Sequence, residues 1–196
     1  MKKKFAIFIG SEQKGLYCAI ANILEKKYNF SVVIIARDSQ VKRYVDKQLP
    51  GRKNDIVLTQ LKVKINHEKF ILEALEIEDK YEINLSILTS EDRSLGQGYL
   101  LNVENIPDII RSSWSHKEKI LDIVTRIKKY ELALKGIDYS IKIWPDKCIT
   151  AIVEKNHGRS FSLTAIKYKD RYLWSDNNFV TSDRYIRHIN RNLALF

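Results

Sequence analysis

The chain has 196 residues, 44% of them hydrophobic and 30% charged, and a formal net charge of +10. This apolar content supports a folded core and excludes an intrinsically disordered chain. Its apolar runs are far shorter than the roughly 20 residues that a membrane-spanning helix needs.

Targeting and metal-binding signals are weak in this sequence. Residues 1–4 (Met-Lys-Lys-Lys) look like the charged start of a signal peptide, but Glu12 and Lys14 interrupt the following apolar run, and no small-residue cleavage site comes after it. Cys18 and Cys148 stand alone, and the four histidines have no metal-ligand spacing. We therefore expect a cytoplasmic protein with two buried free thiols and neither a bound metal nor a cofactor.

The first half of the chain begins with a βαβ pattern, in which a short apolar run, a polar loop, an amphipathic segment and a β-branched run follow one another. The predicted elements, in chain order, are a strand at 5–9, a helix, a strand at 31–36, a helix at 39–48, a weak strand at 55–58, an edge strand at 61–65, a helix at 67–80 capped by Asn66, and a strand at 83–88.

The second half contains the clearest helix, at 115–135, where Ser115 and Glu118 form a capping box and Gly136 ends the helix. A strand at 139–144, a helix at 146–156, a strand at 161–166 and a helix from 182 onward with a basic flank follow. Strands interleaved with helices predict an α/β fold: an open, mostly parallel Rossmann-like sheet with helices on both faces, in a single domain spanning 1–196.

The loop between the first strand and the first helix, Gly-Ser-Glu-Gln-Lys-Gly at 10–15, is the first candidate site. It lacks the Lys-Ser/Thr pair of a phosphate-binding P-loop and the glycine spacing of a dinucleotide fingerprint. Backbone N–H groups at a helix N-terminus suit an anion or a sugar hydroxyl, and Ser11, Gln13 and Lys14 could add contacts. The alternative is a simple turn between strand and helix.

Two further loops follow predicted strands. Glu91, Asp92 and Arg93 come after the strand at 83–88, at the same predicted sheet edge as the first loop, where a carboxylate could act as a general base. A local ion pair or turn is the alternative. Lys167 to Asn177 is dense in cations and aromatics, which suits sugars or single-stranded nucleic acid, or else aromatic side chains packed on the core.

The order of these pieces resembles the N-terminal half of GT-B-type glycosyltransferases that build bacterial capsule and lipopolysaccharide chains. The resemblance rests on the opening βαβ unit, Asp92-Arg93 followed by Gly96-Gln97-Gly98-Tyr99, the long helix, and the loop Lys169 to Asn177. In that family the N-terminal domain binds the acceptor and often supplies the base, and a second domain binds the nucleotide sugar. No second βαβ set follows here, so the resemblance implies a half that needs a second domain, and it leaves independent enzyme activity open.

The resemblance implies transfer of a sugar from a nucleotide-sugar to a glycan or lipid-linked acceptor. Asp92 or Glu91 would be the base, with Glu12 next, and Lys167 and Arg171 would hold acceptor phosphate or carboxylate groups, with Ser11, Gln13, Lys14 and Arg93 as further binding residues. A basic face would also allow peripheral contact with the inner membrane, at about 1 kcal/mol per well-placed cation.

A basic nucleic-acid-binding or RNA-processing module is the alternative function. Residues 1–50 carry a net charge of +6 and residues 151–196 carry +4, so both ends of the chain are basic. Against this alternative, the basic residues do not crowd one helix and no recognition motif is present. A flavodoxin-like or receiver-like domain is a third class, for which Ser11-Glu12 is only a faint match.

Overall fold

The computed structural model describes residues 2–11, 13–66, 68–91, 114–142, 146–165 and 172–175. The chain divides into two compact units: unit 1 comprises Met1–Leu61 and Ala133–Phe196, and unit 2 comprises Lys62–Leu132. Unit 2 is therefore an insertion in the sequence of unit 1.

Unit 1 is built on a six-stranded sheet with the order β3-β2-β1-β4-β5-β6. Strands β1 to β5 pair with one another in parallel, and β6 is antiparallel to β5. The open, mostly parallel sheet predicted from the sequence is confirmed. The strands are β1 (Lys4–Ile9), β2 (Ser31–Ala36), β3 (Ile56–Val57), β4 (Tyr139–Lys142), β5 (Arg159–Ala165) and β6 (Tyr172–Ser175).

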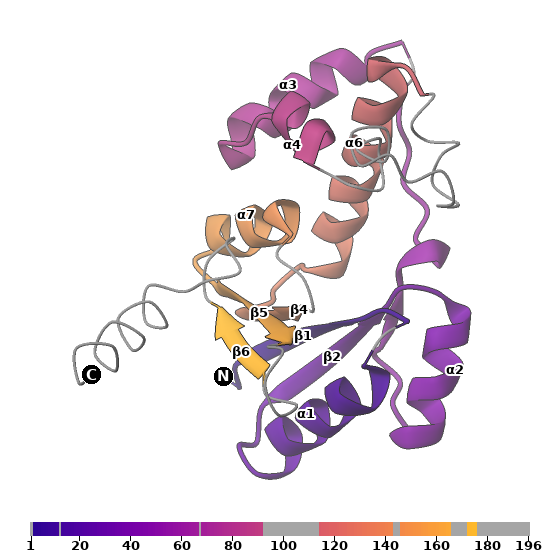
Figure 1. The fold of residues 1–196 in the computed structure, drawn as a ribbon, viewed down its shortest axis with the longest axis vertical. Helices are drawn as coiled ribbons and strands as arrows, with labels where there is room; N and C mark the ends of the chain where they lie inside the picture. Colours follow the sequence, from indigo (N-terminus) through magenta and orange to yellow (C-terminus); the bar gives the residue numbers. More distant parts are fainter. Residues whose placement is uncertain are drawn as a thin grey trace, which may run out of the picture. The chain divides into compact units, whose positions relative to one another are not determined.

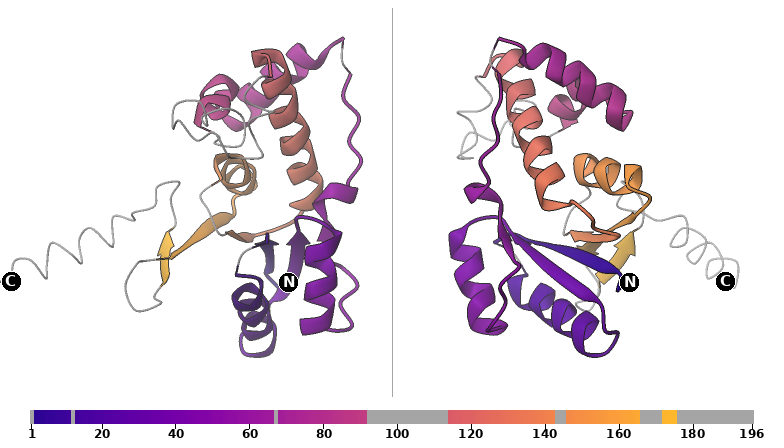
Figure 2. Two further views of the ribbon diagram at one scale, coloured as in Figure 1. Left: turned by 45° about the vertical axis from the view of Figure 1, so that its right-hand side comes forward. Right: turned by 180° about the vertical axis from the view of Figure 1, so that it is seen from behind.

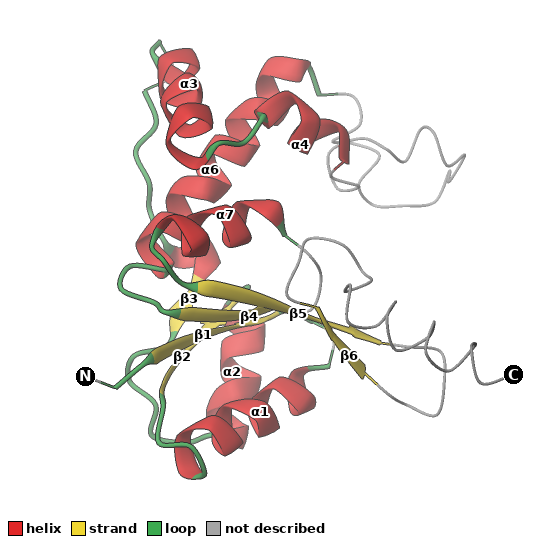
Figure 3. Cartoon of the chain, turned by 90° about the vertical axis from the view of Figure 1, so that its left-hand side faces the viewer, coloured by secondary structure: helices red, strands yellow, loops and turns green. Residues whose placement is uncertain are grey.

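Helices cover both faces of this sheet, also as predicted (Figure 3). The helices α1 (Lys14–Lys26) and α2 (Ser39–Gln48) lie on one side of the strands, and α7 (Lys147–Lys155) lies on the other. The same arrangement is visible in Figure 1 and in both views of Figure 2, where α1 and α2 are indigo and purple and α7 is orange. Open parallel sheets need this cover because both of their faces must be buried.

The two faces of the sheet differ in chemistry. The face toward α1 and α2 is an apolar core in which β1 contributes Phe5, Ile7 and Ile9 and α1 contributes the fully buried Tyr17. On the opposite face, toward α7, β4 and β5 instead contribute buried polar side chains. These are Ser140, Lys142, Ser160 and Ser162.

Unit 2 is helical in its described part, with α3 (Phe70–Tyr81), α4 (Leu85–Glu91) and α6 (His116–Ala133). Lys128 on α6 pairs with Glu73 on α3 at 2.6 Å, and Tyr81 donates to Glu131 at the same distance. The predicted capping box is confirmed, because the carboxylate of Glu118 accepts from the backbone N–H of Ser115 at 2.7 Å.

Two predicted strands in this region are wrong. The run 83–88 leads into α4 instead, which begins at Leu85, because Asn84 caps the helix by accepting from the N–H of Ile87 at 2.8 Å. Residues 61–65 alternate in exposure as an edge strand would, but they pair with no described strand and form an irregular segment after the 3-10 helix Leu58–Gln60. In the described part of the chain no helix has the length and apolarity to cross a bilayer.

Candidate functional site at the carboxyl ends of β1 and β4

The strand order of unit 1 reverses direction between β1 and β4. From β1 the chain builds outward through β2 to β3, whereas β4 lies on the other side of β1 and continues to β5. The helices that follow β1 and β4, α1 and α7, lie on opposite faces of the sheet, and such a switch point is where open α/β sheets bind ligands. We take the residues that follow β1 and end β4 as the candidate site.

The loop after β1 delivers an uncapped helix to this edge. Gln13 adopts a left-handed backbone conformation (φ 52°) and is the N-cap of α1, but no described side chain forms a capping hydrogen bond there and the first turn carries no acid. The buried Oε1 atom of Gln13 has no hydrogen-bond partner among the described residues. Ser11 is exposed, and a side chain added at Gly10 would meet no atom within 4 Å. The loop therefore offers backbone N–H groups and open space to a polar ligand.

Of the other predicted contacts in this loop, Lys14 is engaged elsewhere. Its amine lies 5.2 Å from the centre of the Tyr44 ring of α2, a cation–π arrangement that packs the start of α1 against α2. Gly15 allows this approach, since an added Cβ would come within 3.3 Å of the Tyr44 hydroxyl. Lys14 thus serves the packing of the two helices.

The carboxylate that follows β2 is also committed to structure. Asp38 caps α2 by accepting from the backbone N–H groups of Gln40 and Val41 at 3.0 and 2.9 Å, and it pairs with Arg37. The hydrogen bond from Val41, followed by that from Arg37, holds the pKa of Asp38 below its ordinary value. Asp38 is therefore ionised and stabilises the N-terminus of the helix.

Sequence reasoning missed Lys142, which ends β4. Only 3% of this residue is exposed, and its amine donates to the carbonyl of Asp146 at 2.7 Å and to the Thr150 hydroxyl. Burial lowers the pKa of Lys142 to about 8. The alternation of residues 139–144 is typical of a strand with one solvated face. The signal that could have identified Lys142 is α7, which follows directly and covers that polar face.

Several predicted site residues lie outside the described residues, namely Glu12, Asp92, Arg93, Lys167 and Arg171. Glu91 ends α4 in unit 2. Its expected position beside the first loop rested on a preceding sheet strand, and that basis is wrong because the run 83–88 leads into a helix. Lys167 is expected at this sheet edge because it follows a predicted strand, and that strand is observed as β5, which is parallel to β4. The predicted loop 167–177, however, includes β6.

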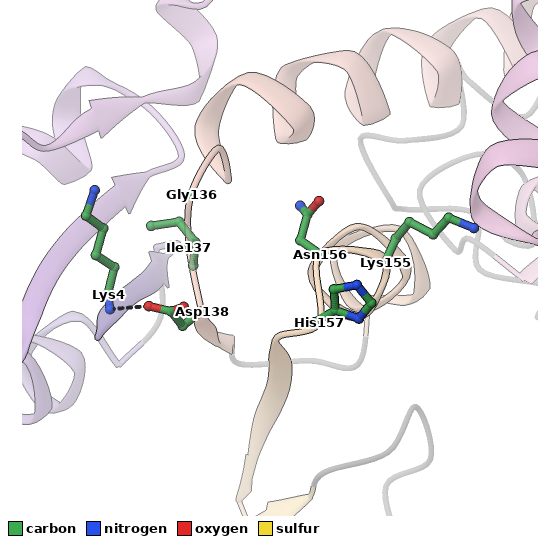
Figure 4. Close-up of a pocket in the computed structure, with 7 residues that line it drawn as sticks. All are labelled: Lys4, Gly136, Ile137, Asp138, Lys155, Asn156 and His157. Carbon is green, nitrogen blue, oxygen red and sulfur yellow. Dashed lines mark hydrogen bonds between the residues drawn. The ribbon is translucent and has the colours of Figure 1, made fainter. Parts of the chain in front are cut away.

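A pocket of about 510 Å³ lies at the amino ends of β1 and β4, away from the candidate site (Figure 4). Figure 4 shows Lys155, Asn156 and His157 on one side of it and Lys4 and Asp138 on the other. Asp138 accepts from the backbone N–H of Lys4 at 2.7 Å, which joins β4 to β1 at this end. The pocket lies at the opposite end of the strands from the switch point.

No metal site is formed by the part of the chain that the structure describes, where no three potential His, Cys, Asp or Glu ligands gather. Cys18 and Cys148 are buried free thiols, as predicted. No protein-family model, curated protein or solved structure matches the chain significantly.

Proposed function

We propose that the chain is the acceptor-binding, Rossmann-like part of a GT-B-type glycosyltransferase in bacterial surface polysaccharide biosynthesis. It would position a glycan or lipid-linked acceptor for transfer of a sugar from a nucleotide-sugar held by a second domain. The observation that supports this most is the uncapped N-terminus of α1 at the switch point, preceded by a loop without either nucleotide fingerprint. Free backbone N–H groups and the amide of Gln13 suit the hydroxyl groups of a sugar.

The reaction needs a base that removes the proton of the acceptor hydroxyl as it attacks the anomeric carbon, a contribution of about 10²–10⁴-fold. Asp92, Glu91 and Glu12 are the candidates from the sequence. Glu91 belongs to α4 of unit 2, and Asp92 follows it in the chain, whereas Glu12 stands between Ser11 and Gln13 of the candidate site. We therefore rank Glu12 first.

A binding experiment tests this function on the chain as it is. Oligosaccharides from bacterial capsules and lipopolysaccharides are presented on an array, and hits are confirmed by saturation-transfer-difference NMR beside UDP-N-acetylglucosamine and GDP-mannose. We expect glycan binding without nucleotide-sugar binding. Ser11→Ala and Gln13→Asn should each weaken it by about 2- to 10-fold, the effect of one hydrogen bond, and Gln13→Asn retains a residue that tolerates left-handed backbone.

The exposed Asn54, in the turn between α2 and β3, provides the control. Asn54→Ala should bind glycans as the unchanged chain does. Binding of the nucleotide-sugars alone, or equal glycan binding by all variants, would contradict the assignment.

The charge of unit 1 favours nucleic-acid binding as the second candidate. Unit 2 contains 11 lysine and arginine residues against 13 acids, which leaves unit 1 with 23 against 11. Electrostatic binding of this kind weakens steeply with salt. Affinity for a single-stranded oligonucleotide that falls at least about 10³-fold between 50 and 200 mM salt would favour this candidate, and no binding at low salt would remove it.

A further inference from the structure

The face of the sheet beneath α7 holds a buried polar cluster. Ser140 pairs in register with Ser160, and Lys142 pairs with Ser162. None of the four is more than 5% exposed, and Ser162 is completely buried. We call Ser140, Lys142, Ser160 and Ser162, with Thr150 of α7, the Lys142 cluster. Its Lys142–Ser162 half lies at the carboxyl-end side of the strand pair.

Two members of the cluster lack a full set of partners. The amine of Lys142 forms two hydrogen bonds, to Asp146 and Thr150, and no ion pair with any described residue. The Ser162 hydroxyl has no hydrogen-bond partner among the described residues, whereas Ser140 donates to Ser160 at 2.7 Å. Buried charges are normally paired and buried hydroxyls normally form hydrogen bonds. Among the described residues, both groups therefore lack a hydrogen-bond acceptor that a further atom could provide.

The nearest carboxylate along the chain does not supply that atom. Asp146 Oδ1 accepts from the backbone N–H groups of Cys148 and Ile149 at 2.9 and 3.1 Å, which caps α7. The N-terminus of α7 is therefore satisfied by its own carboxylate. What remains is a cationic donor and a hydroxyl donor on facing register positions of β4 and β5, a combination that suits an anionic oxygen.

We propose that Lys142 and Ser162 bind an anionic group of the ligand, a phosphate or a carboxylate, at the carboxyl-end side of β4 and β5. The chemistry of the site follows from its two donors. The source of the anion, a uronate or phosphate of a glycan acceptor, rests on the proposed function. An anion here adds a negative charge beside a buried amine that forms no ion pair with a described residue, and it should therefore raise the pKa of Lys142.

The experiment uses inorganic phosphate and D-glucuronate as probes, with D-glucose and sodium chloride at matched ionic strength as controls. We expect the melting temperature to rise with a probe and not with the controls. In protein labelled with ¹³C-lysine, the ¹³Cε resonance of Lys142, identified by its loss in Lys142→Met, should shift and titrate at higher pH. Loss of a hydrogen bond to a charged group costs about tenfold or more in affinity, so Lys142→Met should abolish the effect.

Ser162→Ala keeps the lysine and should weaken binding of the probe several-fold. This variant keeps the test informative if Lys142→Met does not fold. Lys155→Met, an exposed lysine on α7 that lines the amino-end pocket, should change nothing. The proposal is overturned if neither probe acts, in which case a buried water completes Ser162, or if Lys155→Met alone removes the effect. Anion binding without glycan binding would overturn the proposed function but support the anion site. Binding of uncharged glycans alone would support the proposed function and overturn the anion site.

Discussion

At Lys142 the fold places an amine among hydroxyl groups, and burial lowers its pKa from 10.5 to about 8. Asp146, which caps α7, and Glu154 and Cys148 on α7 act in the opposite direction, and the described side chains that β5 places on this face are those of Ser160 and Ser162. Between these two pKa values the unfolded chain holds a proton that the folded chain has released. Stability therefore rises from about pH 8 to about pH 10.5, and below pH 8 the folded chain carries a burial cost of roughly 3 kcal/mol.

We expect Lys142→Met to raise the free energy of unfolding at neutral pH. The change removes the buried charge and leaves the Thr150 hydroxyl still bonded to the carbonyl of Asp146, so the net gain should be about 1–2 kcal/mol after the lost hydrogen bonds. Urea unfolding measures it. The gain should shrink near about pH 10, where the wild-type amine is neutral. A variant less stable than the wild type at neutral pH would show that the amine is needed for folding.

The residues that the sequence could identify are those whose roles are local. Ser115 and Glu118 cap α6 across three residues, and the loop at 10–15 follows from a glycine between an apolar run and a helix. Lys142 depends on contacts that no local pattern records, because its burial needs the packing of α7 over β4. A polar residue on an alternating strand is normally solvated, and tertiary cover reverses that expectation here.

The distinction between local and tertiary signals also decides which helices and strands the sequence could predict. The helix predicted at 39–48 is observed with those bounds, because its apolar positions and its end before Pro50 are local signals. The apolar run 83–88 is equally compatible with a strand and with a buried helix segment. Asn84 and Glu78 select the helix, since Asn84 bonds the N–H of Ile87 and the Glu78 carboxylate accepts from the N–H of Leu85 at 2.6 Å. The second contact depends on α3, which lies outside the run.

Arg52 joins three elements of unit 1 through one guanidinium. It donates to both carboxylate oxygens of Glu25 on α1 at 2.6 and 2.7 Å, to Asp55 before β3 at 3.0 Å, and to the carbonyl of Val32 on β2 at 2.6 Å. The Asp55 side chain is fully buried and also accepts from the N–H of Ile34. Burial works to lower the pKa of Arg52, but the bonds to Glu25 and Asp55 outweigh it, and the pKa is raised.

Arg52→Met should therefore destabilise unit 1 by about 3–5 kcal/mol, because among the described residues it leaves the buried Asp55 carboxylate with Lys42, at 3.6 Å, as its one cationic partner. Denaturant unfolding followed by circular dichroism measures the loss. Arg37→Met is the matched control, since the Arg37 side chain is 61% exposed and, in the described part of the chain, forms an ion pair with its neighbour Asp38 alone. It should cost less than about 1 kcal/mol. Equal losses in the two variants would mean that the Arg52 contacts contribute nothing specific.

For the molecule as a whole, the division into two units gives opposite responses to alkaline pH. Unit 1 contains Lys142, whose contribution to stability rises up to about pH 10.5. Unit 2 contains Tyr81, whose hydroxyl donates to Glu131, and burial, followed by this hydrogen bond, raises its pKa from 10.0 to about 12. Above about pH 10 an unfolded tyrosine ionises while the folded one keeps its proton, so unit 2 loses stability as the pH rises from about 10 to about 12.

Separate probes can follow the two units during urea unfolding. Cys18 and Cys148 are both buried in unit 1, where burial raises the pKa of the Cys18 thiol, so thiol labelling reports opening of unit 1. Trp114 reports unit 2 once Trp144 and Trp174 are replaced by phenylalanine. Between about pH 9 and about pH 11, the Trp114 midpoint should fall, and Tyr81→Phe should reduce that fall because it removes the ionising group. Over about pH 8 to 9 the thiol midpoint should not fall, because the raised pKa of Cys18 opposes the effect of Lys142 only where an unfolded cysteine ionises, from about pH 9 upward. Identical midpoints from both probes at every pH would show that the two units unfold as one.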